Sequence, residues 1–247
     1  MQQQEDGMSF ELCPKDNFNV NAVEQEVSSK VYNLLFEKER KTNKPTTNEE
    51  YVQLLRETIR GRRIAFDQQL FSSRLETIPL RYRNYTFEDY QCESVKDKQI
   101  VEHMKSGQSA ILYGANGTGK TMLAYCAIRY QWEAGKYAQY ILAADFFDLI
   151  RNSFNGGDPL KVLKDFTAFD YLVVDEIDKK HGTQTEYVYL YRLINERYNE
   201  MKATVLISNS SRKDLENVVG ISAFSRVAGD GKIIEFDGED YRKRRAK

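Results

Sequence analysis

Residues 114–121 read Gly-Ala-Asn-Gly-Thr-Gly-Lys-Thr and fit the pattern G-x-x-x-x-G-K-[ST] at every fixed position. An apolar run, residues 110–113, comes directly before this stretch, and residues 121–133 follow it with helical periodicity. A glycine-bearing loop between a strand and a helix points backbone N–H groups and the positive end of the helix dipole at a phosphate chain. The stretch therefore predicts an α/β fold with a nucleotide-binding loop.

Particular side chains of this loop have expected roles. Lys120 is expected to reach the β- and γ-phosphates of the nucleotide, and the Thr121 hydroxyl to hold Mg²⁺. The expected nucleotide-binding residues of the loop are Gly114, Asn116, Gly117, Thr118, Gly119, Lys120 and Thr121. A chance match is the alternative, and the flanking strand and helix argue against it.

A pair of acids follows another apolar run, residues 171–174. Asp175 is expected to lie beside the Thr121 hydroxyl and to bind Mg²⁺ through water, while Glu176 acts as the base that orients the attacking water. Two carboxylates at a strand end that are merely solvated are the alternative. A second acid directly after the Mg²⁺ acid favours nucleotide hydrolysis and argues against a small-molecule kinase.

Short apolar runs alternate with segments of helical length from about residue 85 onward. Besides 110–113, the runs are 140–143, 171–174, 204–207 and 233–236. Such alternation predicts a parallel five-stranded sheet covered by helices on both faces. Asn209 follows the fourth run, where its amide is expected to hydrogen-bond the attacking water or the γ-phosphate, although Asn is also a common strand terminator.

Residues 1–80 read as a small helical region without an obvious deep core. Two segments, 23–34 and 51–59, carry apolar residues at helical spacing after capping boxes that begin at Asn21 and Thr47. Amphipathic helices of this kind must pair with each other, with the main domain or with a partner protein. The sequence therefore predicts a helical partner-binding region with a linker over 1–80 and a nucleotide-binding domain over 81–247.

The composition narrows the function classes. A net charge of −1 gives the 247-residue chain no strong positive field to attract nucleic acid, so any DNA contact must come from a local patch. The three cysteines, Cys13, Cys92 and Cys126, are too widely spaced for a zinc cluster or a disulfide framework, which predicts free thiols in a reducing cytoplasm. No apolar run reaches the roughly 18 residues that a membrane-spanning helix requires.

Several motifs spread over residues 85–242 carry a resemblance to a known family. They are the aromatic opening at 85–90, the loop at 114–121, the acid pair within 173–177, the Gln-Thr-Glu step at 184–186, the strand end at 207–210, and the closing stretch Phe-Asp-Gly-Glu-Asp-Tyr-Arg at 236–242. With these motifs the chain resembles the bacterial and phage helicase-loader branch of the AAA+ ATPases, the DnaC-like proteins, with the IstB-like transposition helpers as close relatives. The resemblance implies a P-loop AAA+ fold that binds ATP and Mg²⁺.

The resemblance implies roles for two further arginines. Arg226 falls where the family places the arginine finger that reaches into the ATP site of a neighbouring subunit, and Arg242 falls where the family has a second nucleotide sensor. A guanidinium that arrives in trans would neutralise transition-state charge and make hydrolysis depend on assembly. The segment 227–231 departs from the family pattern because it lacks a second arginine, and an ordinary surface arginine is the alternative at each position.

The family binds single-stranded DNA with helices that face the pore of its ring. In this chain the segment 146–166 offers aromatic side chains for base stacking together with cations for phosphate pairing. The expected DNA-binding residues are Phe146, Arg151, Lys161 and Lys164. Phenylalanines at helical spacing are more often part of a core, which is the alternative.

The resemblance thus implies a weakly hydrolysing ATPase that assembles on a DnaB-type replicative helicase hexamer and helps to place it on single-stranded DNA in the cytoplasm. Two rival functions stay open. One is an IstB-type transposition helper that remodels duplex DNA, and the other is a nucleotide-gated adaptor in which hydrolysis is incidental. Residues 1–80, which hold the helicase contact in the family, match no part of the family pattern, so the partner is the least determined feature.

Overall fold

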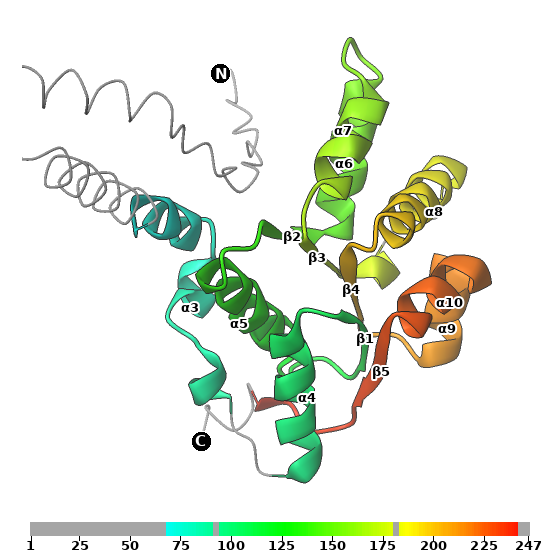
Figure 1. The fold of residues 1–247 in the computed structure, drawn as a ribbon. Helices are drawn as coiled ribbons and strands as arrows, with labels where there is room; N and C mark the ends of the chain where they lie inside the picture. Colours follow the sequence, from blue (N-terminus) through cyan, green and yellow to red (C-terminus); the bar gives the residue numbers. More distant parts are fainter. Residues whose placement is uncertain (1–67, 91–93, 180–182, 242–247) are drawn as a thin grey trace, which may run out of the picture. The chain divides into compact units, whose positions relative to one another are not determined.

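A computed structural model describes residues 68–90, 94–179 and 183–241 of the chain. The described residues fall into two compact units, one that holds the helical residues 68–76 and one that begins at Thr77. The labelled helices and strands of Figure 1 all belong to the unit that begins at Thr77. The helices predicted over 23–34 and 51–59 lie outside the described residues.

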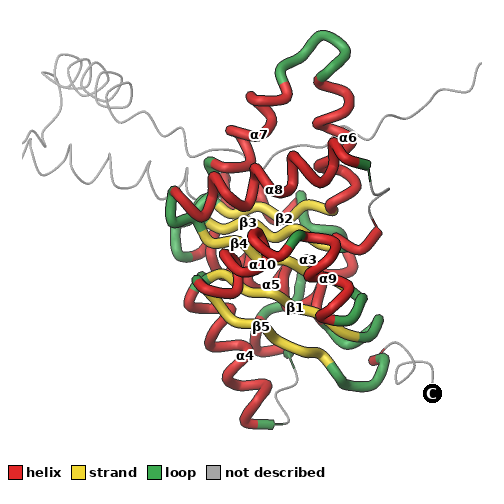
Figure 2. Tube along the Cα trace, turned by 90° about the vertical axis from the view of Figure 1, so that its right-hand side faces the viewer, coloured by secondary structure: helices red, strands yellow, loops and turns green. Residues whose placement is uncertain are grey.

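A five-stranded parallel sheet with the strand order β2-β3-β4-β1-β5 forms the centre of this unit (Figure 1, Figure 2). The strands are β1 (Ser109–Gly114), β2 (Ala138–Leu142), β3 (Tyr171–Asp175), β4 (Ala203–Ser208) and β5 (Gly231–Phe236). β1 lies between β4 and β5, and Leu112 is in register with Ile207 on one side and with Ile234 on the other. The predicted five-stranded parallel α/β fold is confirmed, although the second strand ends at Leu142 and residue 143 already begins a helix.

Helices cover both faces of this sheet. They are α3 (Leu80–Arg83), the 3-10 turn η2 (Phe87–Asp89), α4 (Val95–Ser106), α5 (Lys120–Glu133), α6 (Ala143–Ser153), α7 (Pro159–Thr167), the 3-10 turn η3 (Ile177–Lys179), α8 (Gln184–Asn199), α9 (Arg212–Val219) and α10 (Ile221–Gly229). α4 and α5 pack together on one face, whereas α8, α9 and α10 pack on the other, next to the α6–α7 pair (Figure 1). This division follows from right-handed crossovers, because the chain steps from β1 to β2 in one direction across the sheet and returns through β3 and β4 in the other.

Burial along the strands reflects their place in the sheet. Every residue of the inner strand β3 is buried, which suits the nearly continuous apolar run of a strand covered on both faces. On the edge strand β5, Ile234 and Phe236 are buried while Glu235 between them is exposed. No helix among residues 68–90, 94–179 and 183–241 is long and apolar enough to cross a membrane.

A buried arginine lies at the amino edge of the sheet, where the strands begin. Arg197, near the end of α8, is 0% exposed, and burial lowers its pKa to about 9. Its guanidinium donates hydrogen bonds to the carbonyl oxygens of Phe166, Thr167, Phe169 and Ala203 and to the Thr204 hydroxyl. These bonds join α7, α8 and the first residues of β4, and so fix the edge opposite to the glycine loop.

Candidate active site

The glycine loop connects β1 to α5 and bends through left-handed backbone conformations. Gly114 has a φ of 127°, and a Cβ at this position would lie 2.2 Å from the carbonyl oxygen of Phe236 on β5. Gly117 has a φ of 79°, and a Cβ there would lie 1.8 Å from a carboxylate oxygen of Asp240. L side chains rarely adopt such φ values, so both positions favour glycine, and at Gly114 the obstructing atoms belong to the backbone of β5.

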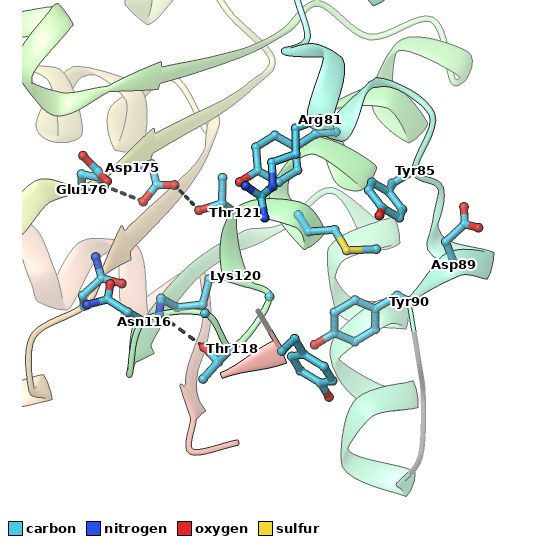
Figure 3. A pocket seen from close by; sticks show the side chains of 16 residues that line it. Arg81, Tyr85, Asp89, Tyr90, Asn116, Thr118, Lys120, Thr121, Asp175 and Glu176 are labelled. Carbon is cyan, nitrogen blue, oxygen red and sulfur yellow. Dashed lines mark hydrogen bonds between the residues drawn. The ribbon is translucent and has the colours of Figure 1, made fainter. Parts of the chain in front are cut away.

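Lys120 occupies the centre of the loop that precedes it. Its side chain is buried, with the whole residue 4% exposed, and Nζ donates hydrogen bonds to the carbonyl oxygens of Gly114 (2.8 Å) and Ala115 (2.7 Å). The Thr118 hydroxyl lies 3.4 Å from the same nitrogen (Figure 3). The loop thus concentrates a positive charge and the N-terminus of α5 at one point, which suits an anionic ligand.

Asp175, the last residue of β3, meets Thr121 across the loop. The Thr121 hydroxyl donates to Asp175 Oδ2 at 2.8 Å (Figure 3), and the Tyr140 hydroxyl of β2 donates to the same oxygen at 2.8 Å. The backbone N–H of Glu176 donates to Oδ1 at 2.6 Å. Burial raises the pKa of Asp175, although these three hydrogen bonds oppose the shift. The structure therefore brings together the two residues that the sequence predicted to hold Mg²⁺.

Glu176 follows the strand in a left-handed conformation with a φ of 56°. Glu176 Oε1 accepts a hydrogen bond from Lys179 Nζ at 2.7 Å. Burial raises the pKa of Asp145 in α6. The negative charges of Asp148 and, to a smaller extent, Glu176 raise it further. The second acid is thus paired with one cation and lies beside the cavity.

Asn209, directly after β4, lies at the same edge of the sheet. Its backbone N–H donates to Asp178 Oδ1 at 3.0 Å, and the Ser208 hydroxyl donates to that oxygen at 2.9 Å. Asp178 belongs to η3 and so connects the end of β4 to the segment that follows β3. The sequence analysis missed Asp178, because an acid three residues after Asp175 has no distinctive spacing.

These groups surround a cavity of about 350 Å³ (Figure 3), within the size range of small-molecule sites. Its wall away from Asp175 and Glu176 carries several tyrosines together with Asp89, and on that side the backbone N–H of Tyr241 donates to the Gly117 carbonyl at 3.0 Å. The lining residues are Arg81, Tyr82, Tyr85, Asp89, Tyr90, 116–122, Asp175, Glu176, Asn209 and Tyr241. The tyrosines come from segments before α4 and after β5, and no periodicity in the sequence marks them as neighbours.

The oxygen atoms at the acid end of the cavity suit a small, hard cation. Among the residues that the structure describes, no group of three or more His, Cys, Asp or Glu side chains is arranged to hold a metal ion. Thr121 and Asp175 supply one hydroxyl and one carboxylate instead, 2.8 Å apart. Mg²⁺ is commonly bound by one or two protein oxygens together with phosphates and water, so this pair fits it.

Of the two predicted arginines, Arg226 does not line this cavity and Arg242 lies outside the described residues. Arg226, half-buried on α10, is not among the cavity-lining residues; its guanidinium lies 5.7 Å from the ring centre of Tyr191 and 5.8 Å from that of Tyr198. Arg226 Nη1 also donates to the Ser222 carbonyl at 3.0 Å.

The prediction that Phe146 stacks on a DNA base is wrong. Phe146 is 0% exposed and packs edge-on against Phe166, so its ring has no free face for a base. Arg151 donates to the buried carboxylate of Glu186 at 2.8 Å, which joins α6 to α8. Lys161 and Lys164 are exposed on α7. The periodicity of phenylalanines in α6 therefore reflects core packing.

The chain is similar to known proteins in sequence and in fold. A family model described as "IstB-like ATP binding protein" matches residues 32–247, so the match includes part of the segment 1–80 in which no family motif was recognised. Over 175 residues, 66% of this chain and 71% of the relative, the chain is 27% identical to "Replicative helicase loader DnaC" of Buchnera aphidicola subsp. Baizongia pistaciae.

Solved structures share the fold. The "Crystal structure of the DnaC helicase loader" is similar with a TM-score of 0.57 and 21% identity, over 64% of this chain and all of that one (100%). AMPPCP-bound DnaA from Aquifex aeolicus is similar with a TM-score of 0.56 and 22% identity, over 67% of this chain. The match spans only about half of that DnaA chain (54%).

Proposed function

The chain belongs to the family of IstB-like ATP-binding proteins, AAA+ ATPases, and from that premise we propose that it is an ATP-dependent helicase loader. In this function it binds a DnaB-type replicative helicase and assists the loading of that helicase onto single-stranded DNA. The observation that carries the ATP-dependent part is the contact of Thr121 with Asp175 beside the buried Lys120. The loader part is supported by the similarity to replicative helicase loaders over 175 residues.

ATP would lie along the cavity with its phosphates in the glycine loop and its base against the aromatic wall. Lys120 and the N-terminus of α5 would bind the β- and γ-phosphates, and Tyr85 or Tyr90 would stack on the base. Thr121 and Asp175 would hold Mg²⁺, which, when bound, neutralises phosphate charge. The hydrogen bond from the Tyr241 backbone N–H to the Gly117 carbonyl would hold the glycine loop against the nucleotide.

Hydrolysis would use the residues at the ends of β3 and β4. Glu176 would orient the attacking water, and the Asn209 amide would hydrogen-bond that water or the γ-phosphate. Arg226 would act in trans, as a finger from a neighbouring copy of the chain. This assignment is supported by the position of Arg226, since it does not line the cavity of its own chain and is partly exposed.

Single-stranded DNA would contact the α6–α7 pair. Lys161 and Lys164 are exposed on α7 and would pair with phosphates, while the buried Phe146 is excluded from base stacking. The exposed ring of Phe154, directly after α6, would take that part. Arg151 would contribute less, because Glu186 already binds its guanidinium.

Light scattering after size exclusion tests the loader function directly. The protein is mixed with the replicative helicase of its host in ATP and in ADP, both as the full chain and as a version that begins at Thr77. That version starts where the second unit starts and keeps the hydrogen bond of Arg83 Nε to the Ile78 carbonyl. A stable complex that forms in ATP and requires the residues before Thr77 supports the loader and makes those residues the docking surface.

If no complex forms in ATP or in ADP, the loader function is contradicted. The proposed ATP site is not affected by that result. The family name then favours a transposition helper as the second candidate. Strong binding to duplex DNA and ATP-dependent filaments would identify that activity. A third outcome is ATP turnover that stays negligible with every partner and DNA added. If turnover in Glu176→Gln is then no lower than in wild type, the protein is an adaptor with incidental hydrolysis.

A further inference from the structure

Three tyrosine rings stack in a row between the cavity wall and Asp175. Tyr82 of α3, which lines the cavity, stacks on Tyr125 of α5 with ring centres 5.1 Å apart. Tyr125 in turn stacks on Tyr140 of β2 with ring centres 4.3 Å apart. Tyr140 ends the row with its hydroxyl, which donates to Asp175 Oδ2 at 2.8 Å. The row thus joins the aromatic wall of the cavity to its acidic end.

The Asp175 carboxylate is held at both oxygens. Oδ1 accepts the backbone N–H of Glu176, and Oδ2 accepts the hydroxyls of both Thr121 and Tyr140. Thr121 can give up part of this hydrogen bond, because its own oxygen is a ligand in the proposed cation site. Tyr140 does not line the cavity, and its ring is fixed by stacking on Tyr125. The Tyr140 hydroxyl would therefore be the side-chain contact that holds the carboxylate if Thr121 bound a cation.

We propose that Tyr140 is a positioning residue, whose hydroxyl fixes the plane of the Asp175 carboxylate so that Asp175 and Thr121 present their oxygens to the same divalent cation. The inference rests on the ATP and Mg²⁺ site proposed above. In the proposed site Tyr140 would touch neither the nucleotide nor the cation, because it does not line the cavity. It acts through Asp175, and its neighbours Tyr125 and Tyr82 hold its ring against the wall of the cavity.

A tyrosine on the neighbouring strand, more deeply buried than the half-buried Tyr140, provides a control. Tyr171 begins β3, the strand that Asp175 ends, and it is fully buried like the core around it. Its hydroxyl has no hydrogen-bond partner among the described residues. Tyr140→Phe and Tyr171→Phe therefore remove the same oxygen from adjacent strands, but only the first removes a contact with Asp175.

The experiment measures the affinity of the full chain for a fluorescent ATP analogue in EDTA and over a range of Mg²⁺ concentrations. For Tyr140→Phe we expect unchanged affinity in EDTA and about a tenfold higher Mg²⁺ concentration for the half-maximal gain in affinity, because one hydrogen bond to a charged group is lost. The Mg²⁺ dependence of ATP turnover should shift by the same factor, with little change in the KM for ATP at saturating Mg²⁺. Tyr171→Phe should leave all of these quantities within about twofold of wild type.

The possible results separate this inference from the proposed function. If wild type gains affinity with Mg²⁺ and Tyr140→Phe behaves like wild type, the inference is wrong while the ATP site stands. An equal shift in Tyr140→Phe and Tyr171→Phe also overturns it, because any buried oxygen would then have the same effect. A wild-type chain that binds no ATP analogue under any condition overturns both the proposed site and the role of Tyr140.

Discussion

A buried cation lies at the amino edge of the sheet, where the strands begin, and another at the carboxyl edge, where they end. The two cations differ in their hydrogen-bond partners. At the amino edge, Arg197 is 0% exposed and donates to four backbone carbonyls and the Thr204 hydroxyl. At the carboxyl edge, Lys120 is 4% exposed and donates to two carbonyls of its own loop, beside a cavity of about 350 Å³. Burial by itself therefore does not distinguish a structural cation from a functional one.

The partners of each cation make that distinction. The carbonyls around Arg197 come from the end of α7, the loop before β3 and the start of β4, so its planar guanidinium joins three different segments, two of them about 30 residues away in sequence. The carbonyls around Lys120 belong to a turn only five and six residues away, and the flexible ammonium can exchange them for phosphate oxygens. We infer that the amino edge determines stability and the carboxyl edge determines ligand binding.

The largest expected effect is on stability, at the amino edge. Arg197→Leu leaves several buried carbonyls without their donor, and we expect the free energy of unfolding to fall by about 3 kcal/mol or more. Urea unfolding followed by circular dichroism measures this. Arg192→Leu on the same helix is the control, because Arg192 is partly exposed and its ion pair with Glu196 is long, at 3.8 Å; its cost should stay below about 1 kcal/mol. A loss of similar size in both variants would contradict the structural role of Arg197.

At the carboxyl edge the expected loss is in binding. Lys120→Ala removes the buried ammonium from the phosphate-binding loop, and we expect ATP affinity to fall about a hundredfold or more while the unfolding midpoint stays close to wild type. Isothermal titration calorimetry and thermal unfolding measure the two quantities. Lys161→Ala on α7, away from the cavity, should leave ATP affinity unchanged. Undiminished ATP affinity in Lys120→Ala would refute the site.

A third variant separates binding from turnover at the same edge. Glu176→Gln keeps the shape of the side chain and removes its basicity, so we expect ATP affinity within about threefold of wild type and turnover lower by about a hundredfold. Phosphate release under single-turnover conditions, with the helicase and DNA present, provides the measurement. Turnover at the wild-type rate would remove Glu176 from its role as the base.

The smallest expected effect is a pH dependence of stability at the amino edge. His103 Nε2 hydrogen-bonds the carbonyl of Ser109, the first residue of β1, at 2.9 Å, and burial lowers the pKa of His103 below its usual 6.5. Below pH 6.5 the unfolded chain therefore takes up a proton that the folded chain resists, and stability present above that pH is lost as the pH falls. Urea midpoints between pH 8 and pH 5 should decline less steeply in His103→Gln, and equal slopes would contradict this.

Local patterns in the sequence predicted the sheet and the phosphate end of the cavity. The glycine loop, the acids after residues 171–174 and the alternation of apolar runs are all short-range signals, because a loop that binds phosphate and a strand buried on both faces each impose their own spacing. They were sufficient to predict that Asp175 and Thr121 would lie side by side, although these residues are 54 positions apart.

Tertiary structure alone decided which other side chains meet there. The hydrogen bond of Tyr140 to Asp175, the link of Asp178 to Asn209 and the burial of Phe146 each depend on strand order, register and helix packing. The same apolar periodicity in α6 is compatible with a core face and with an exposed DNA-binding face, because periodicity defines a face but not what covers it. The sequence by itself therefore determined which residues form the proposed phosphate site. The folded chain determined how these residues are held, because contacts between neighbouring strands and helices have no fixed spacing along the chain.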